Sequence, residues 1–178
     1  PISVSCQPFG EREMKKLAQV GVDRIGIPLD AATKHVFDKI KGPLANGPYT
    51  WEKHHKALKK AVKIFGKGKV STHLIVGLGE TEEEMVKMIQ WCVDNGVYPG
   101  LFSFTPVSGT ALESGSPPSL NHYRRVQVAR YLIANKKTRY ESMTFNSDGH
   151  LINFGVSKDK LVQAIRGGKP FLTSGCPY

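Results

Sequence analysis

The sequence is short of cysteine and of long hydrophobic runs, and each shortage argues against a class of protein. Its three cysteines, Cys6, Cys92 and Cys176, are widely spaced, so they form neither a disulfide framework nor a close pair of metal ligands. This cysteine content favours a reducing compartment. No apolar run approaches the roughly 18 residues that a membrane helix needs, and no signal-peptide pattern opens the chain. We therefore expect a soluble, cytoplasmic protein with no membrane partner.

Acidic residues are also scarce, because 15 of them face 25 lysines and arginines and leave a net charge of +10. Part of the positive charge follows helical spacing between residues 53 and 67, where the lysine stripe consists of Lys53, Lys56, Lys60, Lys63 and Lys67. A stripe backed by apolar residues is typical of the solvated face of an amphipathic helix. No recognised nucleic-acid motif accompanies it, so we favour solvation over nucleic-acid binding.

The most informative stretch is residues 69–85. Residues 70–76 have the composition of a buried parallel strand, and residues 74–76 in particular look buried on both faces. Gly77 and Gly79 permit a sharp turn, and Thr81 with Glu84 forms a capping box that starts a helix. Ligands of open sheets and barrels bind at this end of a strand. The alternative is a tight strand-to-helix turn without a ligand.

Strands and helices alternate through most of the chain. Strands are predicted at residues 2–6, 22–29, 70–76 and 101–107, with helices between them and a long helix at 120–135. Residues 140–145 and 151–154 flank Asp148-Gly149, which predicts a hairpin. This order indicates a TIM-like barrel or a doubly wound sheet, and the missing dinucleotide glycine fingerprint disfavours the sheet. We predict one α/β domain: a partial TIM-type barrel of parallel strands in residues 1–136, then a C-terminal β-hairpin and extension in 137–178.

Four segments resemble biotin synthase and related radical S-adenosylmethionine (SAM) enzymes, over roughly residues 2–144. Residues 75–81, which read I-V-G-L-G-E-T, resemble the same segment on the family's fifth barrel strand. Residues 5–10, S-C-Q-P-F-G, resemble the family's T-C-M-T-L-G on the third strand. Residues 28–31, P-L-D-A, are similar to N-L-D-T after the fourth strand, and residues 104–112 resemble the sixth strand and its G-T-P-L turn.

The resemblance implies a SAM site at the strand ends. The family's aspartate and asparagine after the fourth strand contact the ribose; Asp30 can take over that role, whereas Pro28 offers no side-chain hydrogen bond. The fifth and sixth strands border the adenine. The implied cofactor-binding residues are Asp30, Ile75, Val76, Gly77, Thr105, Pro106 and Val107. The alternative for Asp30 is the cap of the following helix. We expect Glu80 to cap the turn, and His73 to be a core residue of the barrel wall.

The sequence lacks the metal-binding motif that the resemblance implies. Radical SAM enzymes hold a [4Fe–4S] cluster through a C-x3-C-x2-C motif, which residues 1–178 lack. We therefore expect the cluster to be bound by a segment upstream of Pro1, and this chain to be inactive alone. Biotin synthase holds a second cluster, for which Cys6 matches one ligand, while Ser71 and Ser142 fall at or near two others. Cys176 is a candidate ligand of a different auxiliary cluster, as in lipoyl-synthase-like enzymes, or an ordinary cysteine. No residue is a certain metal ligand.

Taken together, the resemblance implies the C-terminal part of an enzyme that generates a 5′-deoxyadenosyl radical for sulfur insertion into a small metabolite. Such an enzyme needs SAM, a small-molecule substrate and a reducing electron donor. Two alternatives remain. One is a radical SAM mutase or lyase, and the other is a non-catalytic basic βα domain that binds an anionic polymer.

Overall fold

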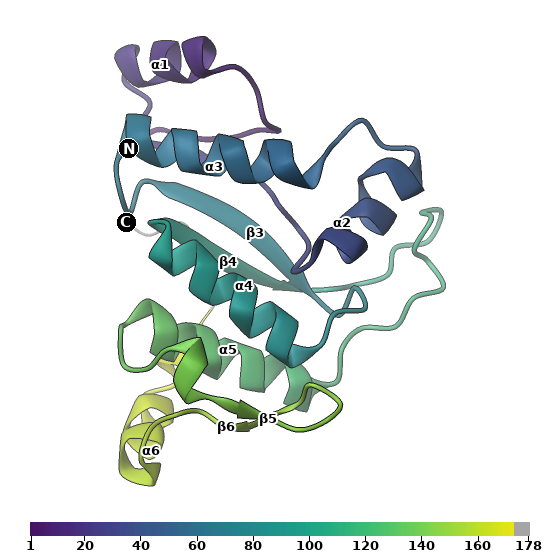
Figure 1. Ribbon diagram of the computed structural model, residues 1–178, viewed down its shortest axis with the longest axis vertical. Helices are drawn as coiled ribbons and strands as arrows, with labels where there is room; N and C mark the ends of the chain where they lie inside the picture. Colours follow the sequence, from purple (N-terminus) through teal and green to yellow (C-terminus); the bar gives the residue numbers. More distant parts are fainter. Residues whose placement is uncertain (173–178) are drawn as a thin grey trace.

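The centre of the protein is a parallel sheet of four strands, seen in a computed structural model that describes residues 1–172. Its strands lie side by side in chain order (Figure 1). They are β1 (Ser3–Ser5), β2 (Arg24–Gly26), β3 (Val70–Val76) and β4 (Val97–Ser103). The predicted α/β fold with parallel barrel-type strands is therefore confirmed. Over the described residues the sheet stays open and does not close into a barrel.

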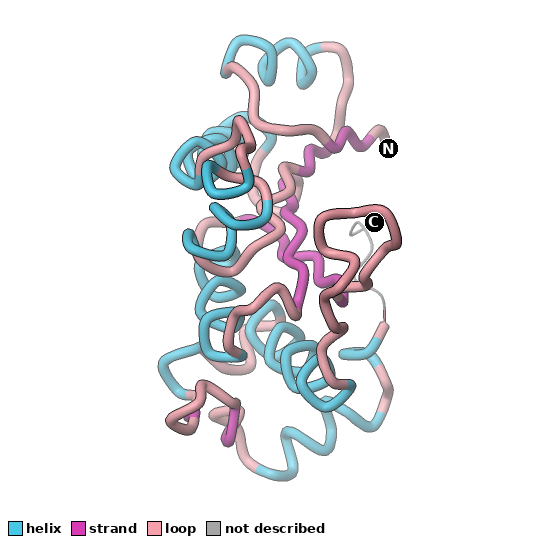
Figure 2. Tube along the Cα trace, turned by 90° about the vertical axis from the view of Figure 1, so that its right-hand side faces the viewer, coloured by secondary structure: helices cyan, strands magenta, loops and turns pink. Residues whose placement is uncertain are grey.

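Helices follow the strands and cover mainly one face of the sheet (Figure 2). They are α1 (Glu11–Gln19), α2 (Lys34–Ile40), α3 (Trp51–Phe65), α4 (Glu82–Asp94), α5 (Leu120–Ala134) and α6 (Lys158–Arg166). Three short 3-10 turns are η1 (Pro43–Ala45), η2 (Tyr140–Ser142) and η3 (Lys169–Phe171). The predicted hairpin is present as β5 (Thr144–Phe145) and β6 (Leu151–Asn153), an antiparallel pair separate from the main sheet. No helix among residues 1–172 has the length and apolarity to cross a bilayer.

The two faces of β3 differ. Val70, Leu74 and Val76 are fully buried in the core that the strand shares with α3 and α4. Ser71, His73 and Ile75 alternate with them and are only half-buried, on the face that lacks covering helices. The sequence therefore correctly predicted a parallel-type strand. Its expectation that residues 74–76 are buried on both faces was wrong for Ile75, because that face of the sheet is open.

Helix starts are the most accurately predicted features. Thr81 accepts a hydrogen bond from the Glu84 N–H, and the Glu84 carboxylate accepts one from the Thr81 N–H, which completes the predicted capping box of α4. Thr50 accepts from the N–H of Lys53 and starts α3 at the expected residue. These signals are reliable because each hydrogen bond spans three residues and depends little on the rest of the fold.

The fourth strand lies about four residues earlier than predicted. The chain enters β4 directly after Gly96, and Val97 pairs with Val70 at the start of the ladder. Pro99 lies within β4, which is an edge strand of this sheet, where a residue without an N–H is tolerated. The last ladder bond runs from the Phe104 N–H to the Val76 carbonyl, at 2.9 Å. Thr105 and Pro106 therefore lie in the loop beyond the strand.

A half-buried histidine in α3 gives the fold a testable acid sensitivity. The ring of His55 lies between Trp51 and Trp91, with ring centroids 4.4 and 4.1 Å away. Burial, followed by the nearby charge of Lys59, lowers the pKa of His55 from its ordinary 6.5 to about 4. The fold therefore holds the neutral ring, while the unfolded chain takes up a proton below pH 6.5.

We expect the free energy of unfolding to fall as the pH drops from 6.5 towards 4, on the order of 1 kcal/mol per pH unit from His55. Below about pH 4 this residue causes no further loss. Urea unfolding of the His55→Phe variant at several pH values should show a shallower decline than the wild type. His35→Phe, which changes an exposed histidine on α2, is the matched control and should keep the wild-type decline. An identical decline in the His55 variant would contradict this assignment.

Candidate functional site

The turn after β3 is built by glycine and a buried glutamate. Gly77 and Gly79 have φ values of 101° and 112°, which side-chain-bearing residues rarely adopt. Glu80 is 6% exposed, and its carboxylate accepts hydrogen bonds from the N–H groups of Gly77 and Leu78 at 2.7 and 3.0 Å. Burial raises the pKa of Glu80, opposed by these N–H donors. Glu80 therefore closes the turn, as the sequence predicted, and holds the end of β3 in a fixed shape.

A pocket with a volume of about 450 Å³ opens at the ends of β2, β3 and β4. It lies on the open face of the sheet, beside the loop of residues 104–119. Its lining is mostly apolar and aromatic, with one carboxylate. The lining residues used below are Asp30, His73, Ile75, Phe102, Phe104 and Thr105. A pocket of this size and composition is typical of a small-molecule site.

The carboxylate of the pocket belongs to Asp30, which lies beyond the end of β2 and forms an isolated parallel bridge with Leu74 of β3. The Asp30 backbone has φ 67°, and it bridges to β3 by accepting from the Ile75 N–H and donating to the His73 carbonyl, both at 2.8 Å. The Asp30 Oδ2 is 2.7 Å from the Nζ of Lys41. Thr33, not Asp30, caps α2, because its hydroxyl accepts from the Val36 N–H. The alternative that Asp30 is a helix cap is therefore wrong.

Lys41 also belongs to this site, although no motif or resemblance in the sequence points to it. Its ammonium group also donates to the Pro28 carbonyl at 2.9 Å and lies over the rings of Phe37 and Tyr49, 5.7 and 5.3 Å from their centroids. The Lys41 side chain is 11% exposed and the Asp30 side chain 21%. An enclosed cation of this kind fixes the direction of the Asp30 carboxylate.

The opposite wall of the pocket is apolar. Ile75 and Phe102 are register partners on β3 and β4, so both side chains stand on the open face. The ring of His73 meets that of Phe102 edge to face, with centroids 5.0 Å apart. Flat apolar walls opposite a carboxylate suit a ligand with a planar ring at one end and hydroxyl groups at the other.

Of the seven predicted cofactor-binding residues, three line the pocket and four do not. Asp30, Ile75 and Thr105 line the pocket together. Val76 is fully buried on the helix side, and Gly77 forms the turn that Glu80 closes. Pro106 and Val107 lie further along the loop outside the lining, and Val107 is exposed. Phe102 and Phe104 lie within the predicted strand 101–107 but were missed, because the resemblance assigned cofactor contacts only to residues 105–107. The pairing of β3 with β4 places Phe102 beside Ile75.

Metal ligands are not gathered anywhere in the part of the chain that the structure describes. Residues 1–172 contain no group of three or more His, Cys, Asp or Glu side chains that could hold a metal ion. Cys6 lies half-buried against the core and Cys92 is fully buried in α4; burial raises the pKa of both thiols. Cys176 lies outside the described residues. Ser71 stands on the open face of β3 next to Gly26.

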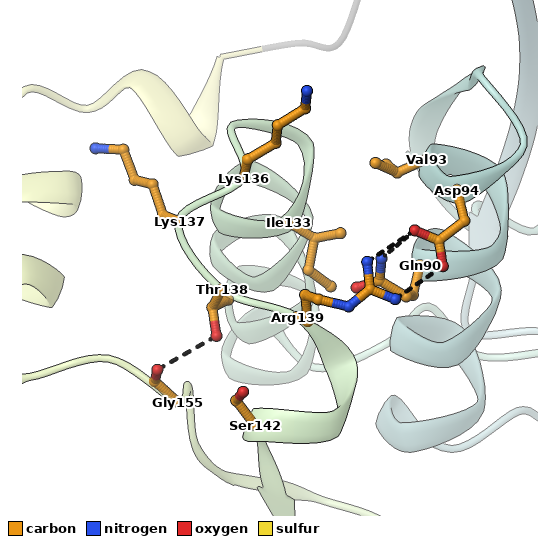
Figure 3. Close-up of a pocket in the computed structure, with 10 residues that line it drawn as sticks. All are labelled: Gln90, Val93, Asp94, Ile133, Lys136, Lys137, Thr138, Arg139, Ser142 and Gly155. Atoms are coloured by element: carbon orange, nitrogen blue, oxygen red, sulfur yellow. Dashed lines mark hydrogen bonds and ion pairs between the residues drawn. The ribbon is translucent and has the colours of Figure 1, made fainter.

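A further hollow, of about 570 Å³, lies between the ends of α4 and α5 and the segment before the hairpin (Figure 3). Ser142 lines this hollow with Gln90, so it does not stand at the strand ends with Asp30. Polar contacts join its walls: Arg139 binds Asp94 at 2.9 Å, and the Thr138 hydroxyl donates to the Gly155 carbonyl. We interpret this hollow as a structural joint, although it is larger than the pocket at the strand ends.

Comparisons with known proteins bear on the family and the fold of the chain. The sequence model of the radical SAM superfamily matches residues 1–92, slightly more than half of the 178 residues. No curated protein matches the sequence. Among solved structures, the chain is similar to a protein from Burkholderia cenocepacia J2315 described as a candidate phosphonomutase, with a TM-score of 0.51 and 14% identity. The alignment covers 96% of this chain but 64% of that one, and at this identity it supports the fold alone.

Proposed function

Because the chain belongs to the radical SAM superfamily, we propose that its pocket at the strand ends holds the adenosine part of SAM. The single observation that carries this proposal is the meeting of Asp30, Ile75 and Thr105 in one pocket of about 450 Å³. These residues come from three separate sequence segments that each resemble a SAM-contacting segment of the family.

The roles follow from the chemistry of the lining. The Asp30 carboxylate, held by Lys41, has a second oxygen available to accept hydrogen bonds from the two ribose hydroxyls. Ile75 and Phe102 would border the adenine ring. Thr105 at the start of the loop offers a hydroxyl to the ring edge. In this arrangement Lys41 and Asp30 together replace the asparagine–aspartate pair of the family, whose first member is Pro28 here.

The cluster that radical SAM enzymes use does not fit residues 1–172, since they offer no set of ligands for it. We propose that another segment of the enzyme holds it, and that this chain contributes the SAM wall. When bound, the cluster supplies the electron that cleaves SAM. The residues described here bind and orient the adenosine and exclude water from it.

For the reaction we propose sulfur insertion into a small metabolite, in a cytoplasmic enzyme supplied by a reducing electron donor. The support is the resemblance of four segments to biotin synthase. The second-cluster ligands of that enzyme are only partly matched, because Ser71 replaces a cysteine and Ser142 lies in the separate hollow of Figure 3. This difference favours a relative with other substrates over biotin synthesis itself.

The proposal is tested by placing a charge against the adenine wall in the cluster-loaded enzyme. We expect Ile75→Asp to weaken SAM binding roughly tenfold to a hundredfold, because it replaces about 1.5–3 kcal/mol of apolar contact with a carboxylate. Anaerobic calorimetric titration of SAM measures the affinity. Ile152→Asp changes an exposed isoleucine of β6 and is the matched control. Equal SAM affinity in both variants would show that this pocket is not the cofactor site.

A further inference from the structure

Another depression, of about 640 Å³, lies at the opposite end of the strands, where β3 and β4 begin. Its lining shares no residue with the pocket at the strand ends. β3 has seven residues, so the two sites are separated by roughly 20 Å along the strand. The depression is therefore distinct from that pocket, and what it binds is independent of the proposed function. It adjoins the hollow of Figure 3, with which it shares Val93 and Lys136.

Four cations from separate parts of the chain line this depression: Lys67, Arg130, Lys136 and Lys169. Lys67 precedes β3, Lys136 follows α5, and Lys169 begins η3. The lining contains no aspartate or glutamate. Within residues 1–172, none of the four cations takes part in an ion pair, whereas Arg125, Arg139 and Lys41 all do. Unpaired like charges gathered in one place repel each other, so an anion bound between them is stabilising.

Arg130 is the fixed member of the cluster. Its Nε donates to the Pro99 carbonyl at 3.1 Å, and its guanidinium lies 4.6 Å from the centroid of the Tyr98 ring. Its Nη2 is buried and has no hydrogen-bond partner among the described residues. The three lysines are exposed and can reach towards a ligand. In Figure 3 the Lys136 ammonium points away from the Arg139–Asp94 pair, so that carboxylate does not neutralise it.

We propose that this depression binds a multiply charged phosphate group of a small molecule. Lysine ammonium groups are compact point charges that suit phosphate, and a volume of about 640 Å³ lies within the range of small-molecule sites. The four cations reach one depression from three parts of the chain: the loop before β3, α5 with the residues after it, and η3. A polymer would instead need a continuous line of charge, such as the members of the lysine stripe on α3, which are Lys53, Lys56, Lys60 and Lys63. The convergence therefore favours a compact anion over a nucleic acid or an acidic protein segment.

The test is a titration of this chain with inorganic pyrophosphate, with ATP and with a glutamate-rich peptide, each followed by calorimetry. We expect pyrophosphate and ATP to bind, and binding to weaken at higher salt. The triple variant Lys67→Gln, Lys136→Gln, Lys169→Gln should bind at least tenfold more weakly. The triple variant Lys53→Gln, Lys56→Gln, Lys63→Gln removes the same charge from exposed positions of α3 and should bind like the wild type.

Comparing pyrophosphate, ATP and the peptide shows which chemical group the depression recognises. Binding of both phosphates with similar affinity indicates recognition of the phosphate group alone, and tighter binding of ATP indicates an added contact with the nucleoside. Equal weakening in the two triple variants, no binding of either phosphate, or tighter binding of the glutamate-rich peptide would each overturn the proposal. Thermal melts of both variants check that the fold is intact, since all six lysines are exposed.

Discussion

Replacing Glu82 by glutamine is expected to lower the free energy of unfolding by about 3–5 kcal/mol. The Glu82 side chain is fully buried. Its two oxygens share the Arg125 Nε–H, at 3.0 and 2.9 Å, and it also accepts from the Arg125 Nη2 and from the Leu151 N–H, the latter at 2.8 Å. One carboxylate thus joins α4, α5 and the hairpin. The glutamine amide removes the charge and leaves the Arg125 guanidinium without its partner.

The Glu82–Arg125 pair also makes the stability of the fold depend on pH in the acid range. Burial alone would raise the pKa of Glu82, but the hydrogen bonds from Arg125 and Leu151 outweigh it and the pKa is lowered. A carboxylate with a lowered pKa stabilises the fold above the ordinary value of 4.5, and this stabilisation is lost as the pH falls below it. We therefore expect the stability difference between wild type and Glu82→Gln to shrink below about pH 4.5.

Urea unfolding measures the loss, and Glu141→Gln is the matched control. Glu141 also binds an arginine, Arg139, but its side chain is 60% exposed, so its removal should cost much less stability than the removal of Glu82. Hydrogen exchange gives a local readout, because the Leu151 amide should exchange faster in the Glu82 variant. If the two variants were equally stable, the buried joint would not support the fold as described.

Replacing Asp30 by asparagine is expected to weaken SAM binding to the cluster-loaded enzyme by roughly tenfold to a hundredfold. The variant keeps the size of the side chain but loses a charge-assisted hydrogen bond worth roughly 1.5–3 kcal/mol. Because Asp30 also pairs with Lys41, we expect a loss of stability as well, of about 1–3 kcal/mol. This loss of stability follows from the Asp30–Lys41 pair, which only the structure reveals.

Two further variants separate these effects. Lys41→Met removes the cation and should weaken SAM binding less than Asp30→Asn, because the carboxylate remains but is no longer fixed. Asp38→Asn removes a carboxylate from a lysine pair on α2, outside the pocket lining, and should leave SAM affinity unchanged. Calorimetric titration gives the affinities and thermal melts the stabilities. Unchanged SAM affinity in Asp30→Asn would limit Asp30 to its structural pairing with Lys41.

The site was only partly predictable, because some of its residues belong to recognisable segments while the positions of others depend on how β3 and β4 pair. Asp30, Ile75 and Thr105 were chosen from segments that resemble a family, and they do meet in one pocket. Val107 was chosen in the same way but lies outside the lining, because its place depends on the residue at which the chain leaves β4. That residue is set by pairing with β3, which local composition does not reveal.

By itself the sequence determined the local elements: the start of α3, the capping box of α4 and the turn at Gly77 and Gly79. Each depends on hydrogen bonds or backbone conformations within a few residues, so nearby residues specify it. Only the tertiary structure decided the Asp30–Lys41 pair, the Glu82–Arg125 joint and the four-cation depression. Their members are brought together by the stacking of βα units, because contacts between residues far apart in the chain depend on how whole elements pack.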